Sequence, residues 1–206
     1  MKEALMSVVS ALVRCRKYAL SILTTYFAAC VVGIFMVHAG NGFALSMRDK
    51  IVRAAMTTDK AAINDRLGNN FAAAVDDCAG NIIYAAVPQT IIGLGIVFPY
   101  CTVAYQGWIG GIVSVNGSHE SRFRNVESSA YYFIVVLLQF IPFSLSIGAG
   151  VKCGVDAYGC NRTVSWRIWK YRIPKESLMD LARVYAAAIP LFFIASCFEF
   201  LSSWNI

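Results

Sequence analysis

Two adjacent carboxylates, Asp76 and Asp77, stand at the start of a long apolar stretch, and their type and position suit chemistry in a membrane. Ionisable groups inside a membrane are costly and often functional, so such a pair could bind a cation or begin a proton path. The alternative is that the pair marks the aqueous boundary, because a span that begins at Asn81 leaves both carboxylates about one helical turn outside it. We favour the boundary interpretation.

The other candidates for catalysis and metal binding are weaker. Ser118, His119 and Glu120 are the residue types of a hydrolase triad, but three consecutive side chains do not point at one another, and a Gly-x-Ser-x-Gly elbow is absent. Cys153 and Cys160 are close enough for a disulfide or half a metal site, but neither of the two histidines is nearby in the sequence. We therefore expect no catalytic residue, no metal site and no cofactor, and a protein that is not an enzyme.

The stretch from residue 81 to residue 115 carries no Lys, Arg, Asp or Glu, yet two prolines and five glycines interrupt it. About 20 apolar residues suffice to cross a bilayer, so this stretch is long enough for one crossing and most of a second. Broken helices at membrane depth are tolerated where neighbouring protein or a water-filled cavity satisfies the freed backbone groups. We expect a broken helix pair at the centre of the bundle, and the alternative is a Pro-kinked span with no role beyond packing.

The composition places the chain in a membrane. Of the 206 residues, 58% are hydrophobic and 15% are charged, against about 25% charged residues in soluble domains. The mean hydropathy is +0.58. The 18 Lys and Arg exceed the 12 Asp and Glu, which could indicate nucleic acid but is also expected where basic loops face anionic lipid. We expect an integral membrane protein that contacts the lipid bilayer and no nucleic acid.

The apolar runs predict an all-α fold, a polytopic transmembrane helix bundle of about five spans. Residues 1–17 are expected to form an N-terminal interfacial helix, and residues 18–206 a single bundle domain. Residues 39–70 are expected to form two short amphipathic helices outside the membrane. Thr57, Thr58 and Asp59 are expected to form the break between them, with the N-cap of the second helix before Ala61. The predicted spans cover residues 18–38, 71–95, 96–115, 128–151 and 181–203.

The basic residues predict the orientation. They gather in residues 14–17 and in residues 152–175, and the positive-inside rule places both regions in the cytoplasm. Four predicted spans separate the two regions, which is the even number that this placement needs. We therefore expect a multi-pass protein of the cell membrane with a cytoplasmic N-terminus and with residues 41–69 on the other side. If residues 96–115 are a re-entrant hairpin, one basic region lies on the wrong side.

Glycines four residues apart predict the closest helix contact. Gly107 and Gly111 lie on one face of a helix, and small residues on such a face let membrane helices approach each other. A face of the same kind exists at residues 148–150. Gln106 and Gln139 could form a hydrogen bond across a contact between the two faces.

These motifs resemble the stage II sporulation protein M family of small multi-pass membrane proteins over about residues 70–203. The family pattern has an Asn-containing start, a glycine-rich region, an Asn-Gly with a further Gly, then Glu and Pro before a small-residue turn, and an apolar span that ends near a Glu. The positions that carry the resemblance are Asn81, Gly93, Gly95, Gln106, Gly107, Gly111, Gln139, Pro142, Gly148, Gly150 and Glu199. Gln106 replaces the expected Asn, Gln139 falls near the expected Glu, and nothing matches the family's His-Gly.

The resemblance implies a non-enzymatic membrane component, since family members are associated with an engulfment complex that works beside cell-wall-degrading partners. We expect a membrane scaffold or assembly subunit that binds other membrane or envelope proteins or forms a homo-oligomer. The alternative is a permease-type subunit in which the broken central helices line a path for a small solute or lipid. An intramembrane enzyme is disfavoured because the sequence has no nucleophile with a base, no metal set and no phosphate loop.

Overall fold

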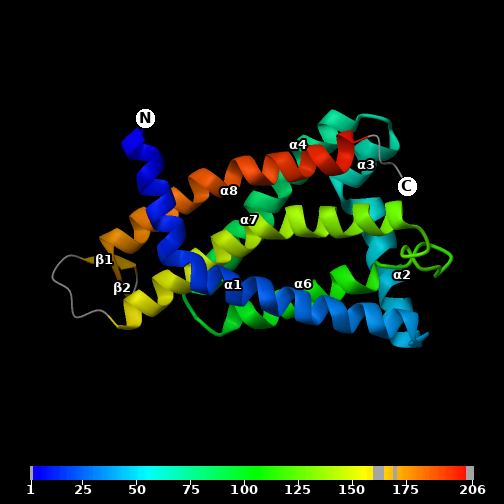
Figure 1. Ribbon diagram of the computed structural model, residues 1–206, viewed down its shortest axis with the longest axis horizontal. Coiled ribbons are helices and arrows are strands. Elements are labelled where there is room, and N and C mark those ends of the chain that lie inside the picture. Colours follow the sequence, from blue (N-terminus) through cyan, green and yellow to red (C-terminus); the bar gives the residue numbers. More distant parts are fainter. Residues whose placement is uncertain (1, 160–164, 169–170, 203–206) are drawn as a thin grey trace.

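The structure, a computed structural model, describes residues 2–159, 165–168 and 171–202 and is a bundle of helices with one short hairpin (Figure 1). Three of the described helices are long and apolar enough to cross a membrane, namely α1 (Lys2–His38), α7 (Val126–Tyr158) and α8 (Lys175–Leu201). The predicted all-α fold is confirmed, and the three long helices are consistent with a membrane protein.

The two predicted spans at residues 71–95 and 96–115 are divided in the structure. The segments that follow one another there are α4 (Asn70–Gly80), the π-helical η1 (Asn81–Ala86), α5 (Val87–Gly93) and α6 (Phe98–Ile112). Each is shorter than the about 20 residues that cross a bilayer, so helix length alone does not establish five crossings. The turn between α5 and α6 contains Ile96 at a φ of 59°, a left-handed conformation that β-branched residues rarely adopt.

Two short helices, α2 (Gly42–Thr58) and α3 (Lys60–Arg66), form the polar interval. The Asn41 side chain caps α2 by accepting a hydrogen bond from the Ala44 N–H at 3.0 Å. The Asp59 carboxylate caps α3 by accepting from the Ala61 N–H at 2.9 Å, as the sequence predicts. Both helices lie at the end of the bundle opposite the hairpin (Figure 1).

The hairpin consists of the antiparallel strands β1 (Ser165–Ile168) and β2 (Tyr171–Pro174), and the sequence analysis did not predict it. Pro174 ends β2, and α8 begins directly after it. Parts of the basic interval, including Cys160, Arg162 and Lys170, lie outside the described residues. The same holds for the proposed pairing of Cys153 with Cys160 and for residue 203, the predicted end of the last span.

Contacts between helices show that the chain runs along the bundle in alternating directions. α1, α6 and α8 run one way, while α7 and the continuous rod of α4, η1 and α5 run the other. The contacts that set these directions are Tyr26–Gly107 and Cys30–Gly111 for α1 and α6, Ala19–Gly148 and Cys30–Tyr132 for α1 and α7, Ser177–Asp156 and Glu199–Gln139 for α8 and α7, and Tyr185–Thr90 and Ser196–Asp77 for α8 and the rod. The chain therefore passes along the bundle five times.

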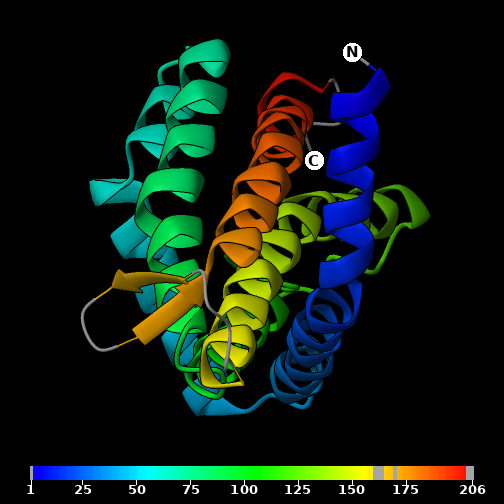
Figure 2. The ribbon, with the colours of Figure 1, turned by 90° about the vertical axis from the view of Figure 1, so that its left-hand side faces the viewer.

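α1 is continuous across residue 17, where the sequence analysis placed the end of an interfacial helix. Figures 1 and 2 show that its N-terminal part crosses the end of the bundle near the hairpin, whereas the rest runs along the bundle. In the N-terminal part, Leu5 and Val9 are exposed while Ala11 and Cys15 are buried. An exposed apolar face beside basic residues is typical of a helix on a membrane surface.

Glycines let helix backbones touch in the interior of the bundle. A Cβ atom added to Gly107 would overlap the carbonyl oxygen of Tyr26 in α1, and one added to Gly111 would overlap the carbonyl oxygen of Cys30. Gly150 of α7 meets the backbone of Thr90 in α5 in the same way. These backbone contacts hold α6 against α1 and α7 against α5.

The partner of the Gly107 and Gly111 face differs from the prediction. The sequence analysis placed this face against residues 148–150, whereas in the structure it packs on α1. Within residues 148–150, Gly148 meets Ala19 of α1, and Gly150 meets α5. The two glycine faces therefore do not pair with each other. The Gly107 and Gly111 face packs on α1, and residues 148–150 pack on α1 and α5.

Candidate functional site

Polar side chains from α4, η1, α7 and α8 meet inside the bundle, and we call them the interhelical polar cluster. Its members are Asp77, Asn81, Gln139, Ser196 and Glu199. The Oδ2 atom of Asp77 accepts hydrogen bonds from Ser196 Oγ at 2.6 Å, from Asn81 Nδ2 at 2.9 Å and from Gln139 Nε2 at 3.1 Å. One carboxylate oxygen of α4 is thus bonded to side chains of three other segments.

Gln139 joins the two carboxylates of this cluster. Its Nε2 atom donates to Asp77 Oδ2 at 3.1 Å and to Glu199 Oε2 at 2.7 Å, and its Oε1 atom accepts from Asn81 Nδ2 at 3.2 Å. A neutral amide offers two N–H donors and one carbonyl acceptor, so it bonds two carboxylates without adding charge. A Glu at the same position would place three carboxylates together, which disfavours ionisation of each.

The π-helical segment positions Asn81. η1 begins at Asn81, and the Val87 N–H donates to the Ile82 carbonyl in the i to i+5 pattern of a π-helix. Such segments occur frequently at functional sites. From the start of η1, the Asn81 amide donates to both Asp77 and Gln139.

The two adjacent carboxylates have separate environments. Asp76 Oδ2 accepts a hydrogen bond at 2.7 Å from Asn64 in the short helix α3. Asp77 belongs to the interhelical polar cluster instead. The two carboxylates therefore contact different segments, and the boundary interpretation stays a prediction for both.

Asp77→Ala is expected to lower the free energy of unfolding by about 1–3 kcal/mol, because three part-buried donors lose their acceptor. Asp76→Ala is the matched control and removes one bond to Asn64, with an expected loss of about 0.5–1 kcal/mol. Thermal unfolding of both variants and of the parent in detergent measures the difference. An equal loss for the two variants would mean that Asp77 is as hydrated as Asp76.

The remaining residues singled out by the sequence lie in helix contacts. Gly93 packs on the backbone of Gly150, and Gly95 faces the ring of Phe98 in the turn before α6. Pro142 is buried inside α7. Gln106 is half-buried in α6, and the described hydrogen bonds of Gln139 go to Asp77, Asn81 and Glu199, so the predicted bond between the two glutamines does not form.

Ser118, His119 and Glu120 form no triad in the structure. His119 Nε2 instead lies 3.1 Å from both carboxylate oxygens of Asp49 in α2. Hydrogen bonds from Arg48 and then His119 hold the pKa of the Asp49 carboxyl below its ordinary value. This contact joins the loop after α6 to α2.

No family model, curated protein or solved structure matches the chain. Its function is therefore argued from the geometry of the described residues.

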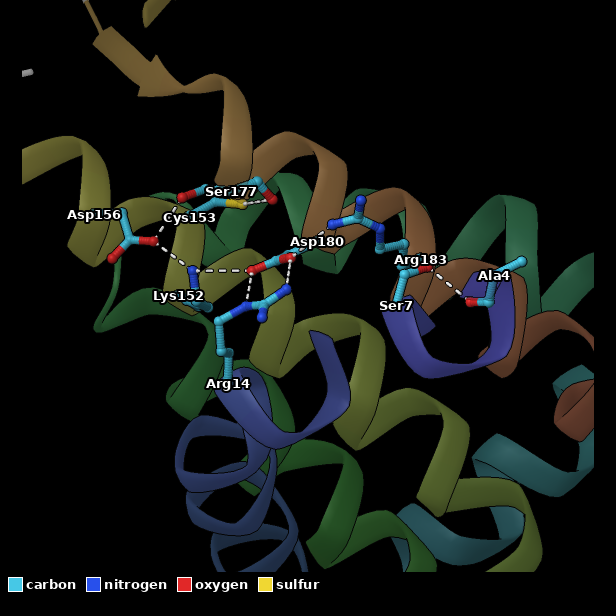
Figure 3. A network of polar contacts seen from close by, with 9 residues as sticks. All are labelled: Ala4, Ser7, Arg14, Lys152, Cys153, Asp156, Ser177, Asp180 and Arg183. Carbon is cyan, nitrogen blue, oxygen red and sulfur yellow. Dashed lines mark hydrogen bonds and ion pairs between the residues drawn. The ribbon is translucent and has the colours of Figure 1, made fainter. Parts of the chain in front are cut away.

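A second group of side chains, which we call the charged cluster, lies at the other end of α8. Its members are Arg14, Lys152, Asp156, Ser177, Asp180 and Arg183 (Figure 3). Arg14 donates to Asp180 from Nε at 2.8 Å and from Nη2 at 2.5 Å, in the bidentate geometry that suits Arg and carboxylate. Lys152 Nζ lies 2.6 Å from Asp156 and 3.5 Å from Asp180. The cluster thus ties α1, α7 and α8 together.

Proposed function

We propose that the chain crosses the membrane five times and acts as a non-enzymatic scaffold or assembly subunit for other membrane or envelope proteins. The observation that carries this proposal is the set of backbone contacts at Gly107, Gly111 and Gly150, which join helices distant in the sequence. Packed interiors resist continuous deformation, so a bundle held by such contacts offers partner proteins a fixed surface. The resemblance to the stage II sporulation protein M family implies the same role.

The lengths of the segments support five crossings. The rod of residues 70–93 is about 36 Å long, and α6 is about 22 Å long, at 1.5 Å per residue. Together with the residues that flank it, α6 gives a pass whose length is close to the thickness of a hydrocarbon core, about 30 Å. Asp180 and Glu199 are about 28 Å apart along α8, so the two polar clusters fall near the two membrane surfaces.

The charge distribution supports the orientation that we propose. Arg14, Lys152 and Arg183 lie at the same end of the bundle as the hairpin. The positive-inside rule then places this end in the cytoplasm. The helices α2 and α3 lie at the opposite end and face the other side of the membrane.

The scaffold proposal predicts a stable complex. Tagged full-length protein extracted from its native membrane in mild detergent should elute with a defined partner, or with further copies of itself, at fixed stoichiometry. An unrelated tagged membrane protein of similar size is the control. Elution of the protein as a partner-free monomer from cross-linked and untreated membranes alike contradicts the proposal.

The interhelical polar cluster favours a second candidate, a permease-type subunit. Asp77 and Glu199 lie between helices, and carboxylates inside membrane bundles mark ion and proton pathways. The same preparation, reconstituted into liposomes that contain a pH-sensitive dye, distinguishes the two candidates. The scaffold predicts proton flux equal to that of empty liposomes, whereas flux that disappears in Asp77→Asn would favour the permease.

A further inference from the structure

A cavity of about 690 Å³ lies beside the charged cluster, whose side chains Figure 3 shows. The N-terminal part of α1 crosses this end of the bundle (Figure 2). The charged and polar lining of the cavity comes from Arg14 of α1, from Lys152 and Asp156 of α7, and from Glu176, Ser177, Asp180 and Arg183 of α8. Small-molecule sites commonly have volumes of about 300–1,000 Å³. The cavity is therefore large enough for a small polar group.

The arginines of this cavity have donors beyond those that hold Asp180. Arg14 uses Nε and Nη2 for Asp180, and Arg183 Nη1 lies 3.4 Å from the same carboxylate. A guanidinium carries five N–H donors. The side chains of Arg14 and Arg183 are 47% and 34% exposed, whereas that of Asp180 is 4% exposed. The two guanidinium groups are therefore more accessible than Asp180, which lines the cavity with little exposed surface.

Two of the three carboxylates that line the cavity, Asp156 and Asp180, are held by hydrogen bonds. Asp156 accepts hydrogen bonds from Lys152 and from Ser177, both at 2.6 Å. Glu176, in the first turn of α8, also lines the cavity and interacts electrostatically with Arg14. Three cations and three carboxylates thus line the cavity, and binding of an anion there relies on the guanidinium N–H donors that Asp180 leaves unused.

We propose that this cavity binds a phosphate group, with Arg14 and Arg183 as the main donors and Lys152 as the third cation. The planar fork of Arg matches the oxygens of phosphate, and the buried Asp180 holds the two forks in place before the ligand arrives. The phosphate belongs either to the headgroup of an anionic phospholipid or to a soluble phosphate ester. This inference is independent of whether the chain acts as a scaffold.

Binding to the purified full-length protein in detergent tests the proposal, with phosphatidylglycerol, phosphatidylcholine and inorganic phosphate as separate probes. Arg183→Gln is expected to weaken binding of the preferred probe at least tenfold, and Arg183→Lys, which keeps the charge but loses the fork, about threefold. The matched control is Arg16→Gln, because Arg16 also lies on α1 but lines a separate apolar groove. It should change the affinity less than twofold.

The outcomes of the binding experiment separate the two sources of phosphate. Binding of phosphatidylglycerol that inorganic phosphate does not displace identifies a lipid headgroup, and displacement at equal concentration identifies a soluble phosphate ester. Both support the site if Arg183→Gln loses the binding and keeps the unfolding temperature of the parent. Equal affinities of Arg183→Gln and Arg16→Gln for every probe overturn the proposal, as does the absence of binding of any probe to the parent.

Discussion

Leu in place of Gly107 or Gly111 is expected to force α6 away from α1 and to lower the free energy of unfolding by about 3 kcal/mol, at the upper end of the range for overpacked cores. The cost is high because the atoms in the way are the carbonyl oxygens of Tyr26 and Cys30, and a helix backbone cannot move aside as the tip of a side chain can. Unfolding of each purified variant in detergent by heat measures the loss.

Gly80→Leu is the matched control for these two variants. Gly80 is also in a helix, but a Cβ atom there would meet nothing within 4 Å. Removing a helical glycine at an open position is expected to be neutral or to stabilise the protein by up to about 1 kcal/mol. If Gly107→Leu proves as stable as Gly80→Leu, the contact between α1 and α6 is not a close one.

Asp180→Ala is expected to lower the free energy of unfolding by about 2–3 kcal/mol. Removing one partner of a fully buried ion pair costs about 3–5 kcal/mol, and the loss here is smaller because Arg14 and Arg183 keep part of their surface in water. The variant leaves Arg14, Lys152 and Arg183 without their shared acceptor. Faster hydrogen exchange in residues 3–17 is expected to accompany the loss, since the bidentate contact holds this part of α1.

Glu120→Ala provides the control for Asp180→Ala. Glu120 pairs with Arg124 at 3.0 Å, but the two side chains are 45% and 65% exposed and lie four residues apart. Exposed ion pairs contribute about 0.2–1 kcal/mol. A loss for Asp180→Ala no larger than that for Glu120→Ala would show that the charged cluster does not hold α1 to the bundle.

The features that depend on local sequence were predictable. The predicted span at residues 128–151 falls inside α7 (Val126–Tyr158), and most of the predicted span at residues 181–203 falls inside α8 (Lys175–Leu201). The N-cap at Asp59 forms as expected because it needs only its own carboxylate and the Ala61 N–H two residues on. Runs of apolar residues and caps act over a few turns of one helix, so a single sequence contains the information.

The features that depend on which helices are neighbours were not predictable. Small residues on a helix face indicate a close contact but do not name the partner, and the Gly107 and Gly111 face was assigned to α7 when it packs on α1. Arg14 and Asp180 are 166 residues apart, so no local pattern joins them. The hairpin after α7 also went unrecognised, because its strands of four residues are too short to show an alternating pattern.

A local signal for the interhelical polar cluster does exist. Asp77 and Asn81 are four residues apart, and Ser196 and Glu199 are three apart, so each pair lies on one helix face. This spacing groups the residues of each helix. It does not show that the two faces meet at Gln139, which requires the antiparallel arrangement of α7 with α8 and the reach of Asn81 from η1.

Site-directed labelling of the turn between α5 and α6 tests the central claim, five crossings, most directly. Val97 is exposed in this turn, and Thr57 and Lys175 are exposed at the two ends of the bundle. In a cysteine-free background, single cysteines at these positions are treated with a membrane-impermeant thiol reagent on intact and on opened cells. Five crossings predict that positions 97 and 175 react only from the cytoplasmic side and position 57 only from the other. If position 97 reacts from the same side as position 57, the rod of α4, η1 and α5 does not cross the membrane, and the account is wrong.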